Sequence, residues 1–415
     1  MHLLLFIGYS LLIIYGLPKI PFVRNSGIRP VFVLLFFALH VFTGILHNWI
    51  AWRYFPGHGD IWQFYEMSFL YRTRLLSDFS QFMADNSTMT YITHNGIIGI
   101  HMLLNILSRD NLTVNTLLFS LPIFLGNIAL FRVFRRRFPR ASAAALTVFL
   151  LPSTLFWTAC IHREGVLYML LGLLIYTFDR WLVSPRQNRM SLFYWVLYTI
   201  LILYFRFYII LSLLPALFIW LLAERPSLIR RLLPPVTALL VLGIVMGFLF
   251  PALSGGLAQA ITDRQLDFSQ LEGNSRLSLP LMAGTWASIF KVLPTAFRNG
   301  FFEPLPGSGG KALYLAFVAE LVLIWFLFFI SLVWRSTHPI TPRQPFIAFC
   351  LLFTFSGLLI IGAMVPFAGA IVRYRSVFLP FLFAPALYWL SASPILSRLN
   401  TWLEKRLLTP IREGV

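Results

Sequence analysis

Acidic residues are scarce in this chain, and one of them stands in a glycine turn directly after a hydrophobic stretch. The segment 56–66 (PGHGDIWQFYE) places Asp60 close to His58, Tyr65 and Glu66. Such a carboxylate can act as a general base on an acceptor hydroxyl, or it can hold a divalent cation. Only 15 residues are Asp or Glu, against 33 Lys or Arg. Asp60 is therefore a candidate catalytic group.

Three further groups combine arginine with other polar or aromatic residues at the ends of apolar runs. The guanidinium group is a planar fork that binds phosphate through two hydrogen bonds, so arginines in such places indicate an anionic ligand. The groups are His162, Arg163 and Glu164 in a charged turn, Arg206 in the run 204–208 (YFRFY), and Arg373, Tyr374 and Arg375 before a late apolar run.

The composition determines the kind of protein that must position these groups. Hydrophobic residues make up 58% of the 415 positions, charged residues only 12%, and the mean hydropathy is +0.78. A soluble domain carries about 25% charged residues, and a helix needs about 20 apolar residues to cross a bilayer. The sequence therefore predicts an all-α, polytopic helical membrane protein. Cys160 and Cys350 fall in apolar spans and indicate neither disulfides nor a metal cluster.

The net charge of +18 is interpreted as topology signals and contacts with lipid headgroups. No compact basic domain is present to bind nucleic acid. The apolar runs predict about eleven transmembrane helices. Their approximate ranges are 3–16, 30–50, 116–134, 141–161, 165–183, 192–205, 207–223, 233–253, 312–334, 346–365 and 377–390.

Arginine and lysine gather in every second connection between these runs, and in the segment that follows the last run. By the positive-inside rule these parts are cytoplasmic, which places the N-terminus outside and the C-terminus inside. The long loops 51–115 and 254–311 then face outward. The first contains the short apolar segment 97–107, which suits an interfacial helix. We expect one membrane domain over 1–392 and a basic, amphipathic, cytoplasmic tail over 393–415.

This topology places Asp60 and the three arginine groups on the outer face. A carboxylate near bound phosphate describes glycosyl transfer from a polyprenyl-phosphate donor, whose tail stays in the membrane. Asp60 would be the base or a metal ligand, supported by His58, Tyr65, Glu66, His162, Glu164 and Tyr374. Arg163, Arg206, Arg373 and Arg375 would bind the donor phosphate, and Trp62, Tyr65 and Trp157 would stack on sugar rings.

At these residues the chain resembles the membrane-integral GT-C superfamily of glycosyltransferases, especially its bacterial members. The similar motifs are 59–65 (GDIWQFY), the segment 152–164 from Pro152-Ser153 to Arg163-Glu164, and Arg373-Tyr374-Arg375. The resemblance covers about the first 225 residues best, and Arg163 stands where the family usually has lysine.

The resemblance implies interfacial helices and an essential acidic residue, here Asp60, in the first outer loop. It also implies sugar transfer from a polyprenyl-phosphate carrier to a glycan, lipid or protein acceptor outside the bacterial cytoplasmic (inner) membrane. The loop lacks the paired acidic residues of the family at its start. A requirement for a divalent cation, Mg²⁺ or Mn²⁺, therefore stays open.

Two alternatives remain. A polymerase of lipid-linked oligosaccharide repeats would depend more on Arg264, Arg276 and Arg298 in the second loop. A transporter or flippase of lipid-linked sugars would form no glycosidic bond, and Glu320, inside an apolar run, is the residue that favours it.

Overall fold

The computed structural model is all-helical. It describes residues 1–55, 57, 59–85, 87–89, 92, 96–184, 189–225, 251–271, 275–305, 312–337 and 345–409, and no strand is formed within these ranges. The chain divides into two compact units. Unit 1 comprises Met1–Trp181, Arg186–Phe205 and Ser391–Val415, and unit 2 comprises Leu182–Pro185 and Arg206–Leu390. Each is described by itself.

Seven helices in the described part of the chain are long and apolar enough to cross a membrane, and a bent pair makes an eighth. This confirms the all-helical class and supports several spans, whereas the count of eleven and the orientation stay predictions. The seven are α1 (His2–Gly16, continued by a 3-10 turn), α3 (Pro30–Tyr54), α8 (Leu112–Arg137), α11 (Arg163–Val183), α13 (Phe207–Glu224), α17 (Ala312–Thr337) and α18 (Pro345–Met364).

The other four predicted spans do not form single long helices in the described part of the chain. The run 141–161 forms two short helices, α9 (Ser142–Leu150) and α10 (Pro152–Thr158). Leu151 between them is extended, because a residue before proline disfavours helical backbone angles. The run 192–205 lies in α12 (Arg189–Phe205), which has only 17 residues. The last run, 377–390, contains α20 (Leu379–Trp389), which forms a bent pair with the preceding α19 (Ala368–Arg375). Of the run 233–253, residues 233–250 lie outside the described residues.

Helix α8 forms the centre of unit 1 and packs against α1, α3, α7 and α9. Aromatic rings fill the layer between α3, α8 and α9: Phe36 lies 4.9 Å from Phe149, and Phe37 lies 5.4 Å from Phe124, centre to centre. Glycines allow α8 and α11 to approach closely. A Cβ added at Gly172 would stand 2.2 Å from the Gly126 carbonyl oxygen. Close packing through small residues is typical of membrane helices.

The basic connections of unit 1 meet at one end. The Arg29 amide donates to the Leu407 carbonyl at 2.9 Å, and the Arg135 guanidinium donates to the Ser26 and Thr409 carbonyls, each at 2.9 Å. The predicted amphipathic tail is the helix α21 (Pro394–Leu407), which contacts α9. Which side of the membrane these segments face stays a prediction.

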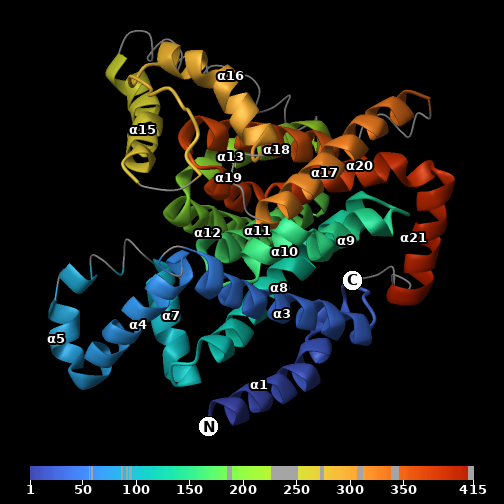
Figure 1. Cartoon of the computed structure of the whole chain (residues 1–415). Helices are drawn as coiled ribbons and strands as arrows, with labels where there is room; N and C mark the ends of the chain where they lie inside the picture. Colours follow the sequence, from blue (N-terminus) through green and yellow to red (C-terminus); the bar gives the residue numbers. More distant parts are fainter. Residues whose placement is uncertain are drawn as a thin grey trace. The chain divides into compact units, whose positions relative to one another are not determined.

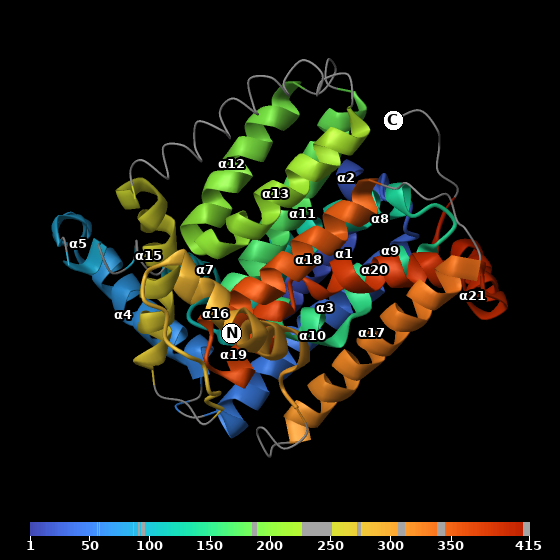
Figure 2. The same ribbon diagram turned by 90° about the horizontal axis from the view of Figure 1, so that it is seen from above.

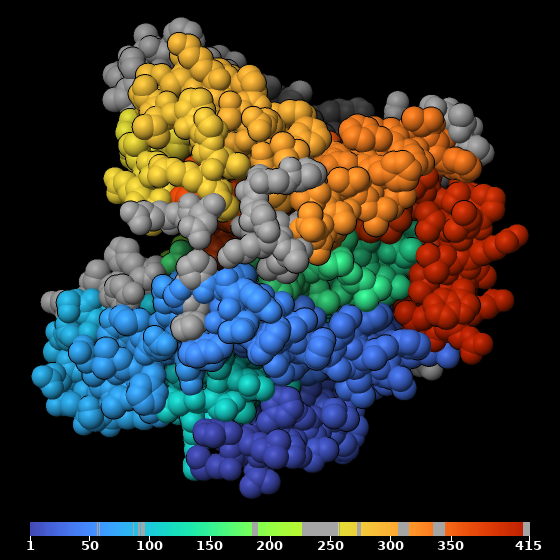
Figure 3. All heavy atoms as spheres, viewed as in Figure 1, coloured from blue at the N-terminus to red at the C-terminus, as the bar shows by residue number. Residues whose placement is uncertain are grey.

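The opposite end of unit 1 carries the first long loop. It contains α4 (Gly59–Ser77), α5 (Phe79–Ala84) and α7 (Gly96–Ser108), the last of which covers the segment predicted as an interfacial helix. Figure 1 shows α3 running between this group and α21. In the space-filling view α4 and α5, in light blue, form a lobe far from the red α21 (Figure 3).

Helix α18 is the centre of unit 2. It packs against α13, α15 (Pro251–Ser269), α16 (Trp286–Phe302), α19 and α20. Figure 2 shows α13 beside α18, where the Trp220 ring packs at tilted angles against Phe346 and Phe349, with ring centres 4.8 and 5.1 Å away. On the other side α16 approaches closely, and a Cβ added at Gly362 would stand 2.0 Å from the Ala296 carbonyl oxygen.

Candidate functional site

Asp60 lies in the first turn of α4, and its side chain is exposed. The turn before the helix needs glycine, because Gly57 and Gly59 have φ of +56° and +72°. A negative charge in the first turn is favoured by the helix dipole. Asp60 and Phe64 stand four residues apart on one face of α4, and the Phe64 ring lies 6.3 Å from that of His162. That face therefore turns toward the α10–α11 connection.

A cluster of aromatic and histidine side chains forms at the end of α3 nearest α4. The buried His47 of α3 has ring-centre distances of 4.6 Å to Phe156, 5.3 Å to Trp157 and 5.7 Å to His162. Trp157 also stacks on Phe55 at 6.4 Å. The predicted site residues Trp157 and His162 thus meet here, and both are buried.

The other predicted residues of unit 1 surround this cluster to different degrees. Glu164 is buried in the first turn of α11, and Arg163, the first residue of that helix, is half-buried. Trp62 is half-buried, and its indole nitrogen donates to the Asn48 carbonyl at 3.1 Å. Glu66 is exposed, and His58 lies outside the described residues.

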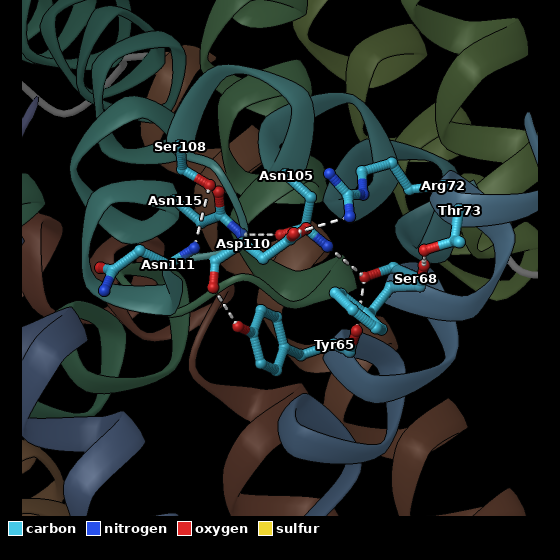
Figure 4. Close-up of polar contacts among 10 residues, drawn as sticks. Tyr65, Ser68, Arg72, Thr73, Asn105, Ser108, Asp110, Asn111 and Asn115 are labelled. Atoms are coloured by element: carbon cyan, nitrogen blue, oxygen red, sulfur yellow. Dashed lines mark hydrogen bonds and ion pairs between the residues drawn. The ribbon is translucent and has the colours of Figure 1, made fainter. Parts of the chain in front are cut away.

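Tyr65 belongs to a separate polar network that holds α4, α7 and α8 together (Figure 4). Its hydroxyl donates to the Asp110 carbonyl at 2.5 Å, and the Asp110 carboxylate forms an ion pair with Arg72 at 2.7 Å. Burial raises the pKa of Tyr65, and the neighbouring Asp110 charge raises it further. Burial also raises the pKa of Asp110, although Arg72 opposes this effect. Tyr65 is thus engaged in the scaffold through its hydroxyl.

Asn105 extends this network into the interior. Its amide nitrogen donates to the Ser68 hydroxyl at 2.9 Å, and its amide oxygen accepts from Asn115 at 2.5 Å. Both asparagines are fully buried. The two asparagine amides thus join α4, α7 and α8. They hold α4, whose first turn carries Asp60, against the centre of unit 1.

In unit 2 two predicted arginines converge on one tyrosine. The guanidinium carbon of Arg206, the residue before α13, lies 4.4 Å from the ring centre of Tyr374. The corresponding distance for Arg373 is 5.0 Å, and its Nη2 donates to the Tyr374 hydroxyl at 3.1 Å. Tyr374 itself is buried. Two guanidinium groups are thus held on one ring, an arrangement whose N–H groups are suited to an anion.

Arg375 has different surroundings from Arg373. It is only 2% exposed, and its Nη1 donates to the carbonyls of Glu303 and Gly300 at 2.6 and 3.4 Å. The carboxylates of Glu303 and Glu320 interact electrostatically with it. Arg375 therefore joins α19 to the end of α16, and Glu320 has a cationic neighbour within unit 2.

Sequence reasoning missed His47 and the network of Arg72, Asn105 and Asp110. One signal for His47 was present, since a histidine within an apolar span is costly unless it has a role. The network gave no comparable signal, because its members lie in a loop where polar residues are usual.

No protein-family model matches the chain, and comparisons with curated proteins and with solved structures find no match either. The resemblance to the GT-C superfamily therefore stays a prediction.

Proposed function

We propose that this protein is a membrane glycosyltransferase. It transfers a sugar from a polyprenyl-phosphate donor to a glycan, lipid or protein acceptor on the outer face of a bacterial cytoplasmic membrane. The observation that carries the proposal is the convergence of Arg206 and Arg373 on Tyr374. The helices long enough to span a membrane support a lipid-linked donor.

The arginine pair supplies a means of holding phosphate. Cation–π contact with the Tyr374 ring restrains both guanidinium groups, so less conformational freedom is lost when an anion binds. The fork of each arginine can direct two N–H groups at phosphate oxygens. A bound phosphate also offsets the repulsion between the two positive charges. The donor phosphate is both the group that is bound and the group that leaves.

Asp60 is the general base of the proposed reaction. It accepts the proton of the acceptor hydroxyl while the acceptor oxygen bonds to the anomeric carbon and the bond from that carbon to the phosphate oxygen breaks. The products are the new glycoside and the polyprenyl phosphate. A base must be ionised before it reacts, and its position in the first turn of α4 favours the charged form. If a divalent cation takes part, Asp60 is its candidate ligand.

The phosphate role is tested by measuring how the purified protein in nanodiscs binds a polyprenyl monophosphate. We expect Arg206→Ala and Arg373→Ala each to weaken binding about tenfold or more, because hydrogen bonds to charged groups contribute about 1.5–3 kcal/mol. Lys291→Ala is the matched control, since Lys291 is an exposed cation of α16 in unit 2. Equal affinity in the unmodified protein and all three variants would show that Arg206 and Arg373 do not bind the phosphate.

A polymerase would depend more on the second long loop. Two arginines of that loop make structural contacts within unit 2. Arg276 donates to the Ser269 carbonyl at 2.7 Å, and Arg298 lies 3.7 Å from Glu303. No observation therefore favours the polymerase over the transferase. If Arg276→Ala made a shortened glycan while Arg206→Ala made a normal one, the polymerase would be favoured over the transferase.

A further inference from the structure

Three potential metal ligands meet beside the C-terminal half of α3. They are His47 of α3 and Cys160 and His162 of the connection between α10 and α11, and their ligand atoms all lie within 4.8 Å of one another. All three side chains are buried, with relative exposures of 1%, 0% and 4%. They come from segments far apart in the sequence, so only the fold brings them together.

The short connection and its neighbours determine this arrangement. The His162 amide donates to the Cys160 carbonyl at 2.8 Å, a tight turn that directs both side chains toward α3. The rings of Phe156 and Trp157 surround His47, and the Cys160 thiol donates to the Trp157 carbonyl at 3.3 Å. The ligand atoms are thus enclosed by aromatic side chains.

The distances are close to those of a metal centre. Donors around an ion with a metal–nitrogen distance of about 2.0–2.1 Å and a metal–sulfur distance of about 2.3 Å stand about 3.3–3.8 Å apart. The ligand atoms of the three residues lie at most 4.8 Å apart. This is about 1 Å more than the upper end of that range, a difference that small side-chain rotations can close. The two imidazole rings are 5.7 Å apart and nearly perpendicular, and one ion in the plane of both rings would hold them at about this distance.

The donor types select the class of metal. Two imidazoles and a thiolate suit Cu⁺ and Zn²⁺, whereas Mg²⁺, Mn²⁺ and Ca²⁺ prefer oxygen ligands. Charge favours Cu⁺ of the two, because Cu⁺ and one thiolate sum to zero and a buried net charge is costly. Such a thiophilic ion is chemically distinct from the Mg²⁺ or Mn²⁺ that Asp60 could hold.

We propose that His47, Cys160 and His162 bind one thiophilic transition-metal ion, Cu⁺ or Zn²⁺, with Cu⁺ the tighter. Binding replaces the thiol proton by the metal and releases that proton to solvent. The affinity therefore falls about tenfold for each unit by which the pH drops below the thiol pKa.

The test uses the purified full chain in detergent, titrated separately with Cu⁺ and Zn²⁺ against a chromophoric chelator. We expect one ion per chain in the unmodified protein and in Cys350→Ser, which removes the other buried free cysteine. Cys160→Ser and His162→Gln should lose at least tenfold in affinity. Tighter binding of Zn²⁺ with the same dependence on Cys160 would support the site and overturn the preference for Cu⁺.

X-ray absorption of the loaded unmodified protein tests the site without relying on any variant. One sulfur at about 2.3 Å and two nitrogens at about 2.0 Å are expected. Thermal unfolding of metal-free Cys160→Ser shows whether that variant keeps its fold. A shell without sulfur, equal affinity in Cys160→Ser and the unmodified protein, or no bound ion with either metal would overturn the proposal.

Discussion

The guanidinium carbon of Arg206, the residue before α13, lies 4.4 Å from the ring centre of Tyr374 in α19, although the two are far apart in the sequence. Arg373 approaches the same ring within 5.0 Å. This relationship makes two separate sequence motifs, the turn at 204–208 and the segment 373–375, parts of one positive site in unit 2. The site is the part of the proposed function that has a defined geometry.

The Tyr374 ring should matter more than its hydroxyl. Tyr374→Phe keeps the ring face for both arginines and removes the hydroxyl that accepts from Arg373, so we expect affinity for a polyprenyl monophosphate to change less than about threefold. Tyr374→Leu removes cation–π contacts of about 0.5–2 kcal/mol and should weaken binding about tenfold. Binding isotherms in nanodiscs measure both, and equal losses in the two variants would contradict the ring's role.

The buried amide network should contribute strongly to the stability of unit 1. Asn105→Ala leaves the Ser68 and Asn115 groups without their Asn105 partner in the interior, which costs about 1–3 kcal/mol. We expect a lower midpoint of thermal unfolding in detergent. Adding Asn115→Ala should cost less than the sum of the two single changes, because both act on one network. Additive losses would show that the network does not act as a unit.

The contact of α8 and α11 should tolerate no side chain at Gly172. Gly172→Ala places a Cβ 2.2 Å from a backbone oxygen, so the helices must separate, at a cost of about 1–3 kcal/mol. Gly8→Ala in α1 is the matched control, since nothing lies within 4 Å of the added Cβ. We expect a lower unfolding midpoint for Gly172→Ala alone. The same midpoint in both variants would contradict this packing.

The helical membrane class could be predicted from the sequence, because long apolar runs have few structures available to them. The break at Pro152 was not predicted, although proline disfavours helix in the residue before it and marks the boundary between α9 and α10. A run that looks continuous in hydropathy can thus form two short helices. Hydropathy counts apolar residues and is insensitive to the backbone.

The site could be predicted only as separate parts. Arg206 and Arg373 were each predicted to bind phosphate because they stand at the ends of apolar runs, but their convergence on Tyr374 depends on how α13 and α19 pack. The trio of His47, Cys160 and His162 was missed for the same reason. Metal motifs read from sequence rely on short spacing, and His47 stands far along the chain from the other two.

The most direct test of the account is sugar transfer from a labelled polyprenyl-phosphate sugar by membranes that contain the protein. Asp78→Asn is the matched control for Asp60→Asn, since Asp78 is an exposed carboxylate of the same loop, and asparagine caps α5 as well as aspartate does. We expect Asp60→Asn to accumulate normally, to bind polyprenyl monophosphate normally and to lose transfer at least a hundredfold, as expected for a general base. Asp78→Asn should transfer at nearly the unmodified rate. Full transfer by Asp60→Asn would contradict the central claim.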